Sequence, residues 1–548
     1  MTSLSRATPK IVNSMMNLPL DLASLLRHAA REHGGTPLIT LGSDGSLRRS
    51  TWADLEQRAR RWGQAWQRLG LPPGSTVALL GWNAQGLLEA VLGTAAAGLQ
   101  ALALNPRQFP EQLIFAINRC QAQAMVVDPQ MAPLLEAMQL QMASVSHYVQ
   151  LGGPEALPLN ADALALIDAE SMLTVDDPDW EWPQVDERQP ALISFTSTNA
   201  GWPRGVPTSH RGAVLQAWSA ALPDAYGLSR HDTVMPLLPV SHSGGWAMCL
   251  SAALVGSRLV LVPPGMEAHH LVECMANHHV TLAAGPPNIW QAVMDALDAG
   301  APWPMALQRA SVGAAAFPPP LLDRLRTWPG LKVLHTWGMS EVAPPALVAD
   351  DALLTPDAEG RLPQGRAAFG VELALADDAG RSLARDGLCE GHLLVRGPWT
   401  LDAYIGEAET PLLTLDGEGA WLPTGDIARI TPEGVVTITD RRKDLIRCGG
   451  EWISAQLLER IAKLHPSVGE AAVIAQADPQ VGESPLLVVV IASGAEAPPN
   501  DELLALYDGR VADWQRPRGA LVFPELPKLP TGEVDKRELR ALVETLLD

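Results

Sequence analysis

Lysine is scarce in this chain. Of the 40 basic residues among 548, six are lysines and the rest are arginines. Chemistry that requires an ammonium group therefore has few candidates, namely Lys10, Lys332, Lys443, Lys463, Lys528 and Lys536.

Paired cysteines and a positive charge balance are also lacking. The five cysteines are scattered without a Cys-x-x-Cys pair, so neither a disulfide framework nor a zinc site is indicated, and a reducing cytoplasm is the default location. The net charge of −21 and the pI near 5.0 argue against binding to nucleic acid or to an anionic membrane, because both need a basic face. A small-molecule enzyme fits this composition better.

Long apolar runs are absent too. The longest, such as residues 486–492, have the length of a strand, and no apolar run follows Arg6 and Lys10. The sequence therefore predicts no signal peptide and no membrane span. With 47% hydrophobic residues, a chain of this length is expected to form two or three subdomains.

Helical and extended patterns alternate along the chain. A helical face begins at Thr51 and includes Trp52, Trp62 and Trp66, which we interpret as core residues; a strand at 76–80 and a helix at 87–97 follow. This alternation predicts an α/β fold with mainly parallel sheets, followed by a β-rich subdomain. Short strands among helical patterns after residue 443 predict a small α+β domain. We therefore expect a large domain at 1–442 and a small one at 443–548.

The stretch 421–454 joins the two expected domains. Asp426 follows the turn Thr424-Gly425, where a short carboxylate can accept two hydrogen bonds from a diol such as ribose. Arg441 comes fifteen positions later, beyond a short predicted strand. The pair indicates a nucleotide-binding site.

Three blocks in this stretch resemble the hinge region of the adenylate-forming (AMP-binding, ANL) superfamily: Thr424-Gly425-Asp426, Asp440-Arg441-Arg442-Lys443-Asp444 and Gly449-Gly450-Glu451-Trp452-Ile453-Ser454. Within this superfamily, the sequence of these blocks is most similar to that of the fatty-acyl and medium-chain acyl-CoA synthetases. The resemblance implies that Asp426 and Arg441, with Ile438, hold the AMP ribose and that Lys443 is the swivel between domains. It further implies that the small domain is mobile and that a coenzyme A tunnel is lined by Gly449, Gly450, Glu451 and Trp452.

The segment Thr336-Trp337-Gly338-Met339-Ser340-Glu341 resembles a second signature of the same family. The resemblance implies that Trp337 stacks on adenine, that the Ser340 hydroxyl contacts the α-phosphate and that Glu341 helps to hold Mg²⁺, with Thr336, Gly338 and Met339 as further nucleotide contacts. The small residues of 310–316 suit a loop against which a purine lies, although a tight structural turn would look the same. The nucleotide-binding candidates in that loop are Gly313, Ala314 and Ala315.

Two further segments depart from the family pattern. The loop Thr196-Ser197-Thr198-Asn199-Ala200-Gly201-Trp202-Pro203-Arg204-Gly205 resembles the family's loop around the outer phosphates of ATP, yet a glycine, two threonines and a lysine are replaced by Thr198, Asn199, Ala200 and Arg204. Alone it would be an ordinary polar loop. In 235–246, Leu238-Pro239 replaces the family's Phe-His pair. His242 and Trp246 are the acyl-pocket candidates, and His242 is alternatively a solvated turn residue.

The last departure concerns the family's catalytic lysine. In the segment Leu529-Pro530-Thr531-Gly532-Glu533, Glu533 occupies the position of that lysine. In the family, this lysine bridges the substrate carboxylate and the α-phosphate while the acyl-adenylate forms. Loss of such an electrostatic group costs a factor of about 10² to 10³, and reversal of its sign should cost more.

The altered residues match ATP's outer phosphates and the adenylation lysine, whereas those matched to AMP and to the thioester tunnel remain. We therefore favour an enzyme that forms a CoA thioester from the acyl-adenylate of a hydrophobic acid, with adenylation weak or lost. Two alternatives stay open: a complete ATP-dependent ligase and an inactive homologue that binds a nucleotide, acyl ligand or partner protein. The expected ligands are AMP or acyl-AMP, coenzyme A and Mg²⁺, with ATP undecided. A separate adenylating enzyme and a homodimer are the candidate protein partners.

Overall fold

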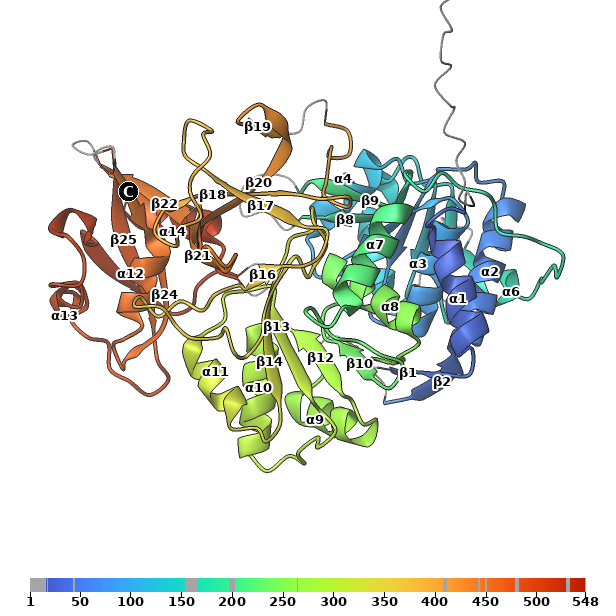
Figure 1. The fold of residues 1–548 in the computed structure, drawn as a ribbon, viewed down its shortest axis with the longest axis horizontal. Coiled ribbons are helices and arrows are strands. Elements are labelled where there is room, and N and C mark those ends of the chain that lie inside the picture. Colours follow the sequence, from blue (N-terminus) through green and yellow to red (C-terminus); the bar gives the residue numbers. More distant parts are fainter. Residues whose placement is uncertain are drawn as a thin grey trace, which may run out of the picture.

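The computed structural model describes residues 16, 18–42, 45–152, 166–196, 203–263, 265–407, 412–441, 444–448, 451–478, 482–528 and 533–547. Four sheets organise the described residues, and helices separate and cover them (Figure 1). The helices are α1 (Leu22–His33), α2 (Trp52–Arg68), α3 (Gln85–Ala96), α4 (Pro110–Arg119), α5 (Ala132–Met138), α6 (Ala169–Met172), α7 (His210–Ala221), α8 (Ser243–Val255), α9 (Ala268–Asn277), α10 (Pro287–Asp298), α11 (Pro319–Arg326), α12 (Ala455–Ala462), α13 (Asn500–Ala505) and α14 (Lys536–Leu547).

The largest sheet has nine strands, and its centre, from β14 to β1, is parallel. In spatial order its strands are β16 (Arg366–Ala367), β15 (Leu347–Ala349), β14 (Lys332–Trp337), β13 (Arg309–Gly313), β12 (Leu282–Gly285), β10 (Thr233–Pro236), β11 (Arg258–Leu261), β1 (Pro37–Leu41) and β2 (Leu47–Thr51). The second sheet has seven strands in the order β7 (Leu166–Asp168), β6 (His147–Gln150), β5 (Ala124–Val127), β3 (Thr76–Leu80), β4 (Gln100–Leu104), β8 (Pro190–Phe195) and β9 (Gly205–Ser209). The expected parallel α/β architecture is therefore confirmed.

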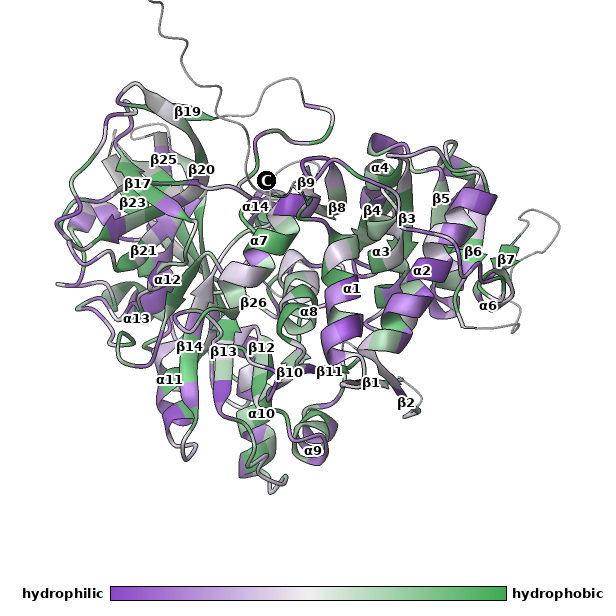
Figure 2. Cartoon of the chain, turned by 45° about the vertical axis from the view of Figure 1, so that its right-hand side comes forward, coloured by the Kyte–Doolittle hydropathy of each residue, from purple (hydrophilic) through white to green (hydrophobic). Residues whose placement is uncertain are grey.

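Helices α2, α3 and α8 contribute to the core shared by these two sheets. Thr51 caps α2 through a reciprocal pair of hydrogen bonds with Asp54, and the helix contains both hydrophilic and hydrophobic residues (Figure 2). Trp52, Trp62 and Trp66 are fully buried on its inner face. The Trp66 indole also donates to Thr94 Oγ1 at 2.9 Å. The interpretation of these tryptophans as core residues is confirmed.

Two smaller sheets follow in the second half of the chain. The third contains β17 (Glu372–Ala376), β18 (Gly391–Arg396), β20 (Glu418–Ile430), β19 (Leu413–Leu415) and β21 (Val436–Arg441), all antiparallel. The fourth belongs to the smaller C-terminal part, orange to red in Figure 1, and contains β23 (Glu451–Ser454), β22 (Leu445–Cys448), β25 (Gly482–Ile491), β24 (Val468–Asp478) and β26 (Gly519–Phe523). A large α/β part and a small α+β part are thus present, as expected. The boundary at residue 443 stays a prediction.

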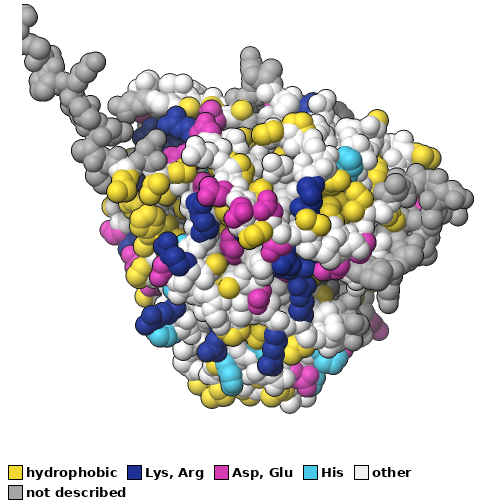
Figure 3. Space-filling view, turned by 90° about the vertical axis from the view of Figure 1, so that its right-hand side faces the viewer, with side chains coloured by type: hydrophobic (Ala, Val, Ile, Leu, Met, Phe, Trp, Pro, Cys, Tyr) yellow, Lys and Arg dark blue, Asp and Glu magenta, His cyan; other side chains and the backbone are white. Residues whose placement is uncertain are grey.

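The surface shown in Figure 3 mixes acidic and basic side chains, with the basic ones occurring singly or in small groups. Within the described ranges, no helix combines the length and apolar character that crossing a bilayer requires.

Candidate active site

One cavity of about 1010 Å³ brings together most of the described residues that the sequence singled out. It opens where β10, β12, β13 and β14 end, which is where ligands bind in parallel α/β sheets. Its polar part is lined by Thr196, Arg204, Gly313, Ala314, Thr336, Trp337, Gly338, Met339, Ser340, Glu341, Asp426 and Glu533.

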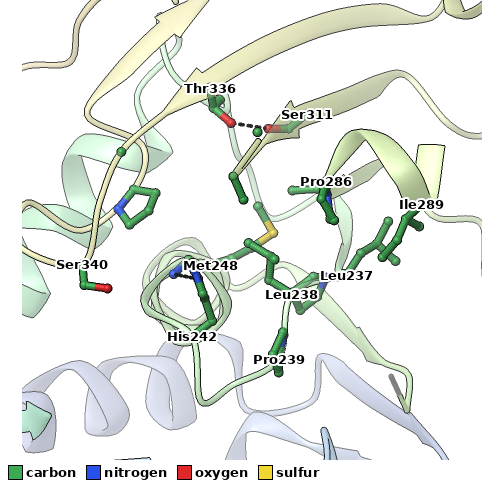
Figure 4. Close-up of a pocket in the computed structure, with 18 of the residues that line it drawn as sticks. Leu237, Leu238, Pro239, His242, Met248, Pro286, Ile289, Ser311, Thr336 and Ser340 are labelled. Atoms are coloured by element: carbon green, nitrogen blue, oxygen red, sulfur yellow. Dashed lines mark hydrogen bonds between the residues drawn. The ribbon is translucent and has the colours of Figure 1, made fainter. Parts of the chain in front are cut away.

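Strands β13 and β14 approach closely at the floor of the cavity. A Cβ atom on Gly313 would lie 2.5 Å from Thr336 Oγ1, so only glycine fits there. The hydroxyls of Ser311 and Thr336 are 3.1 Å apart (Figure 4). The next residue, Ala314, has a φ of +65°, which turns the chain away from the sheet; Ala315 is not among the residues that line the cavity.

The predicted nucleotide-binding pair lies on neighbouring strands. Asp426 on β20 is opposite Arg441 on β21 in the antiparallel register. The Asp426 carboxylate is buried and accepts a hydrogen bond of 3.0 Å from the indole Nε1 of Trp337. Ile438 is on the same strand as Arg441, and its N–H donates to Gln364 Oε1 at 2.6 Å. The carboxylate and the aromatic ring thus form one wall of the cavity.

Glu341 is held by a residue that the sequence did not single out. The buried Glu341 carboxylate accepts a hydrogen bond of 2.8 Å from the hydroxyl of Tyr404. Burial raises the pKa of Glu341, and the Tyr404 hydrogen bond opposes that shift. Within the described part of the chain no cluster of three metal-binding side chains occurs. A lone carboxylate still fits Mg²⁺, which proteins usually bind through one or two carboxylates together with substrate phosphates and water.

Arg204 is also tied to residues that the sequence reasoning missed. Its guanidinium lies 3.5 Å from the centre of the Tyr404 ring and forms two hydrogen bonds with the Glu407 carboxylate, one of them 2.7 Å long between Nε and Oε1. Glu407 is 203 residues away in sequence, and it belongs to no motif. No local sequence signal could have identified this pair.

The other half of the cavity is mainly apolar, with side chains from the ends of β10 and β12 and from α8 (Figure 4). His242 lines it and caps α8, because its Nδ1 accepts the Gly244 N–H at 3.1 Å. Burial lowers the pKa of His242 to about 4, so the imidazole is neutral at pH 7. Its neighbours on the wall include Leu237, Leu238, Pro239, Met248, Pro286 and Ile289.

Trp246, the other acyl-pocket candidate, lies elsewhere. Its side chain is buried in the core, where the indole donates to Ser194 Oγ at 3.3 Å, and it is not among the residues that line the cavity. The helical turn that begins at Ser243 carries the indole to the inner side of α8. This placement gives Trp246 a packing role and does not support a contact with the acyl group.

Glu533 lines the same cavity as Thr336 and Asp426 and is half-buried. The two lysines that flank it in sequence are paired elsewhere, Lys528 with Glu470 at 2.8 Å and Lys536 with Glu459 at 2.7 Å. Among the described residues, the cations that line the cavity are Arg107 and Arg204.

Several candidates lie outside the described residues, namely Ser197, Thr198, Asn199, Ala200, Lys443, Gly449 and Gly450. The strands β21 and β23 include Arg441, Glu451 and Trp452, whose side chains are not described.

The fold and the cavity define an α/β protein whose cavity has a polar half and a mainly apolar half. The family model for the AMP-binding enzymes matches residues 26–405, and the model for the AMP-binding enzyme C-terminal domain matches residues 457–533. The chain belongs to the AMP-binding enzyme family, and the recognition from sequence is confirmed.

Similar proteins span nearly the whole chain. It is 38% identical over 540 residues to a 3-methylmercaptopropionyl-CoA ligase of Ruegeria lacuscaerulensis, which covers 97% of this chain and 98% of the relative. It is 34% identical over 536 residues to a medium-chain-fatty-acid–CoA ligase of Ectopseudomonas oleovorans, with 97% of each chain covered. The anthranilate CoA ligase AuaEII, solved in complex with anthranoyl-AMP, has the same fold, with a TM-score of 0.81, 21% identity and coverage of 97% of this chain and 99% of that one.

Proposed function

We propose that the protein is an acyl-CoA ligase that forms the CoA thioester of a hydrophobic carboxylic acid from its acyl-adenylate. In this proposal the ATP-dependent adenylation step is weak or lost. The likeness to CoA ligases over nearly the full chain supports the thioester product, and the apolar half of the cavity supports a hydrophobic acid.

One observation supports a weak adenylation step. Glu533 lines the cavity together with Thr336, Trp337 and Asp426, the residues proposed to contact AMP. A carboxylate there would repel both the acid's carboxylate and the α-phosphate. These two anionic groups must approach each other for the adenylate to form. Transfer of a ready-made acyl group to a thiol does not need that encounter.

The proposal also assigns roles to other residues. Trp337, Asp426 and Arg441 bind AMP, Ser340 contacts the α-phosphate, and Glu341 holds Mg²⁺, which would neutralise phosphate charge. His242 lies beside the acyl chain. The small domain turns about Lys443, and Gly449 and Gly450 line the path of coenzyme A.

A complete ATP-dependent ligase is the second candidate, because two relatives named as CoA ligases match 97% of this chain at 38% and 34% identity. In that case Arg204 and another group compensate for the missing lysine.

A pair of assays separates the candidates: thioester formation from synthetic acyl-AMP plus CoA, and from acid, ATP and CoA. Straight-chain acids of graded length and 3-methylmercaptopropionate form the substrate panel. We expect the rate from acyl-AMP to exceed the rate from acid plus ATP by at least about a hundredfold. Equal rates would establish the complete ligase, and no turnover in either assay would establish the inactive homologue.

A further inference from the structure

The Arg204 guanidinium, which lines the cavity, already has an anionic partner in Glu407. Two of its nitrogens donate to the two oxygens of Glu407, and its Cζ atom lies over the Tyr404 ring. The hydrogen bond between the two residues raises the pKa of Arg204 and lowers that of Glu407. Both groups are therefore charged near neutral pH, and the pair is a fork of two parallel bonds, the strongest geometry for a guanidinium and a carboxylate.

The segment that presents Glu407 is fixed to the same hairpin as Arg204. The Ile405 N–H donates to Gly205 O at 2.9 Å, and the Glu407 N–H donates to Tyr404 O at 3.2 Å. A Cβ atom on Gly205 would lie 3.1 Å from Ile405 Cβ, so the two backbones are in close contact. Arg119 adds a hydrogen bond of 3.1 Å to Ile405 O. Glu407 is thus held beside Arg204 by backbone contacts of its own segment.

A guanidinium fork can grip one oxyanionic group at a time in this geometry. Arg204 stands where the loop around the outer phosphates of ATP is expected, and this part of the reasoning rests on the proposed function. Outer phosphates could use the fork only by displacing Glu407. If they bound without displacing it, they would meet its negative charge.

We propose that Glu407 is a specificity-determining residue that occupies Arg204 in place of a phosphate, so that the site does not favour a nucleoside triphosphate over a monophosphate. Glu407 acts through Arg204, and the ligand class selected is AMP and its acyl esters. This role differs from that of Glu533, which concerns the joining of acid and α-phosphate and not the binding of ATP.

The test measures the affinities of AMP and of ATP with Mg²⁺ by calorimetry, without acid or CoA, so that no turnover is involved. In the wild type we expect the two affinities to agree within about threefold. Glu407→Gln keeps the shape of the side chain and removes its charge, and it should raise the ratio of ATP affinity to AMP affinity by about tenfold, the value of one charged hydrogen bond. Glu390→Gln is the matched control, because Glu390 pairs with Arg429 at 2.7 Å and neither residue lines the cavity.

The double variant Arg204→Gln/Glu407→Gln distinguishes two explanations of that gain. In the first, which we call the clamp, Glu407 occupies the Arg204 guanidinium; in the second, Glu407 only repels the phosphates by its charge. Loss of the tenfold gain in the double variant would support the clamp, since the gain then requires the freed guanidinium. A gain that persists without Arg204, or a ratio that Glu407→Gln leaves unchanged, would overturn it. The proposed function is judged separately: rapid ATP-dependent turnover by the wild type would remove that proposal, whereas the clamp is decided by the affinity ratio alone.

Discussion

Replacing Glu533 with lysine is expected to raise the rate of ATP–pyrophosphate exchange, which our proposal expects to be low in the wild type. The substitution puts an ammonium at a half-buried position in the wall of the cavity that Thr336 and Asp426 also line. The wild-type carboxylate would repel the acid's carboxylate and the α-phosphate, whereas the ammonium would attract both. Adenylation is the step in which these two anions must come together, so it should respond more than thioester formation.

The size of the effect follows from Coulomb's law. At an effective dielectric constant of about 20, each unit-charge pair at a separation of about 4 Å changes from roughly +4 to roughly −4 kcal/mol. Because Glu533 is partly exposed, solvent screens much of this change. About 3 kcal/mol retained in the transition state corresponds to roughly a hundredfold faster exchange. The altered loop should still limit the rate, so a further increase is expected when the family's residues are also restored by Thr198→Gly, Asn199→Thr and Ala200→Thr.

The assay is the exchange of labelled pyrophosphate into ATP in the presence of a hydrophobic acid. Glu544→Lys is the matched control, because it makes the same change of charge at an exposed position on α14, outside the cavity. The expected ranking is wild type equal to the control, then Glu533→Lys, then the combined variant. If the wild type already exchanges rapidly and Glu533→Lys changes nothing, Glu533 does not occupy the lysine's position and the complete ligase replaces our proposal.

Three other perturbations test separate parts of the molecule. Asp426→Ala should weaken the binding of AMP by about 1.5 to 3 kcal/mol in calorimetry, because the ribose loses a charged hydrogen-bond acceptor; unchanged affinity in this variant would contradict the ribose assignment. Gly450→Leu should abolish acylation of CoA and leave acyl-AMP binding intact, because a side chain would block a narrow thiol path, whereas normal CoA turnover would refute the tunnel. Burial lowers the pKa of His210 to about 4 from 6.5, so its stabilising effect is complete above pH 6.5 and is lost as the pH falls towards 4. Between pH 7.5 and 5.5, the unfolding free energy of the wild type should fall by about 1.4 kcal/mol more than that of His210→Gln, which keeps an acceptor for the Leu22 N–H; equal losses in urea titrations would mean that His210 does not titrate as described.

The parts of the site that the sequence located are those within one short motif or one hairpin. Asp426 and Arg441 are fifteen positions apart with a turn between them, and a hairpin of that length puts them opposite each other on β20 and β21. Thr336 and Trp337 end a buried strand, and side chains at such an end face the ligand edge of a parallel sheet. Local pattern and strand geometry were sufficient for these residues.

Contacts between distant segments could not be predicted in the same way. Tyr404 reaches Glu341 across 63 residues, and Glu407 reaches Arg204 across 203. Neither contact leaves a periodic pattern, because the loop after β18 meets the residues that follow β14 in the first case and the β8–β9 hairpin in the second. Trp246 shows that a local motif can also mislead. Its motif predicted a position in the acyl pocket, but the direction of one turn of α8 puts its indole in the core.

Glu407 and Glu533 together support one last inference about the ligand that the site favours. They come from different segments: Glu533 lines the cavity, and Glu407 is paired with Arg204, which lines it. In our proposals, the binding or reaction of ATP would bring further negative charge towards both carboxylates. A site that had only decayed would lose contacts throughout, including those to AMP. Yet the hydrogen bond between Trp337 and Asp426 and the buried Glu341–Tyr404 pair are intact. We infer that the charge pattern favours a monophosphate ligand over a triphosphate, and the combination of Glu407→Gln with Glu533→Lys tests this directly. If the two carboxylates act on separate steps, the first substitution should change ATP affinity and the second the rate of exchange, with their effects adding in the double variant.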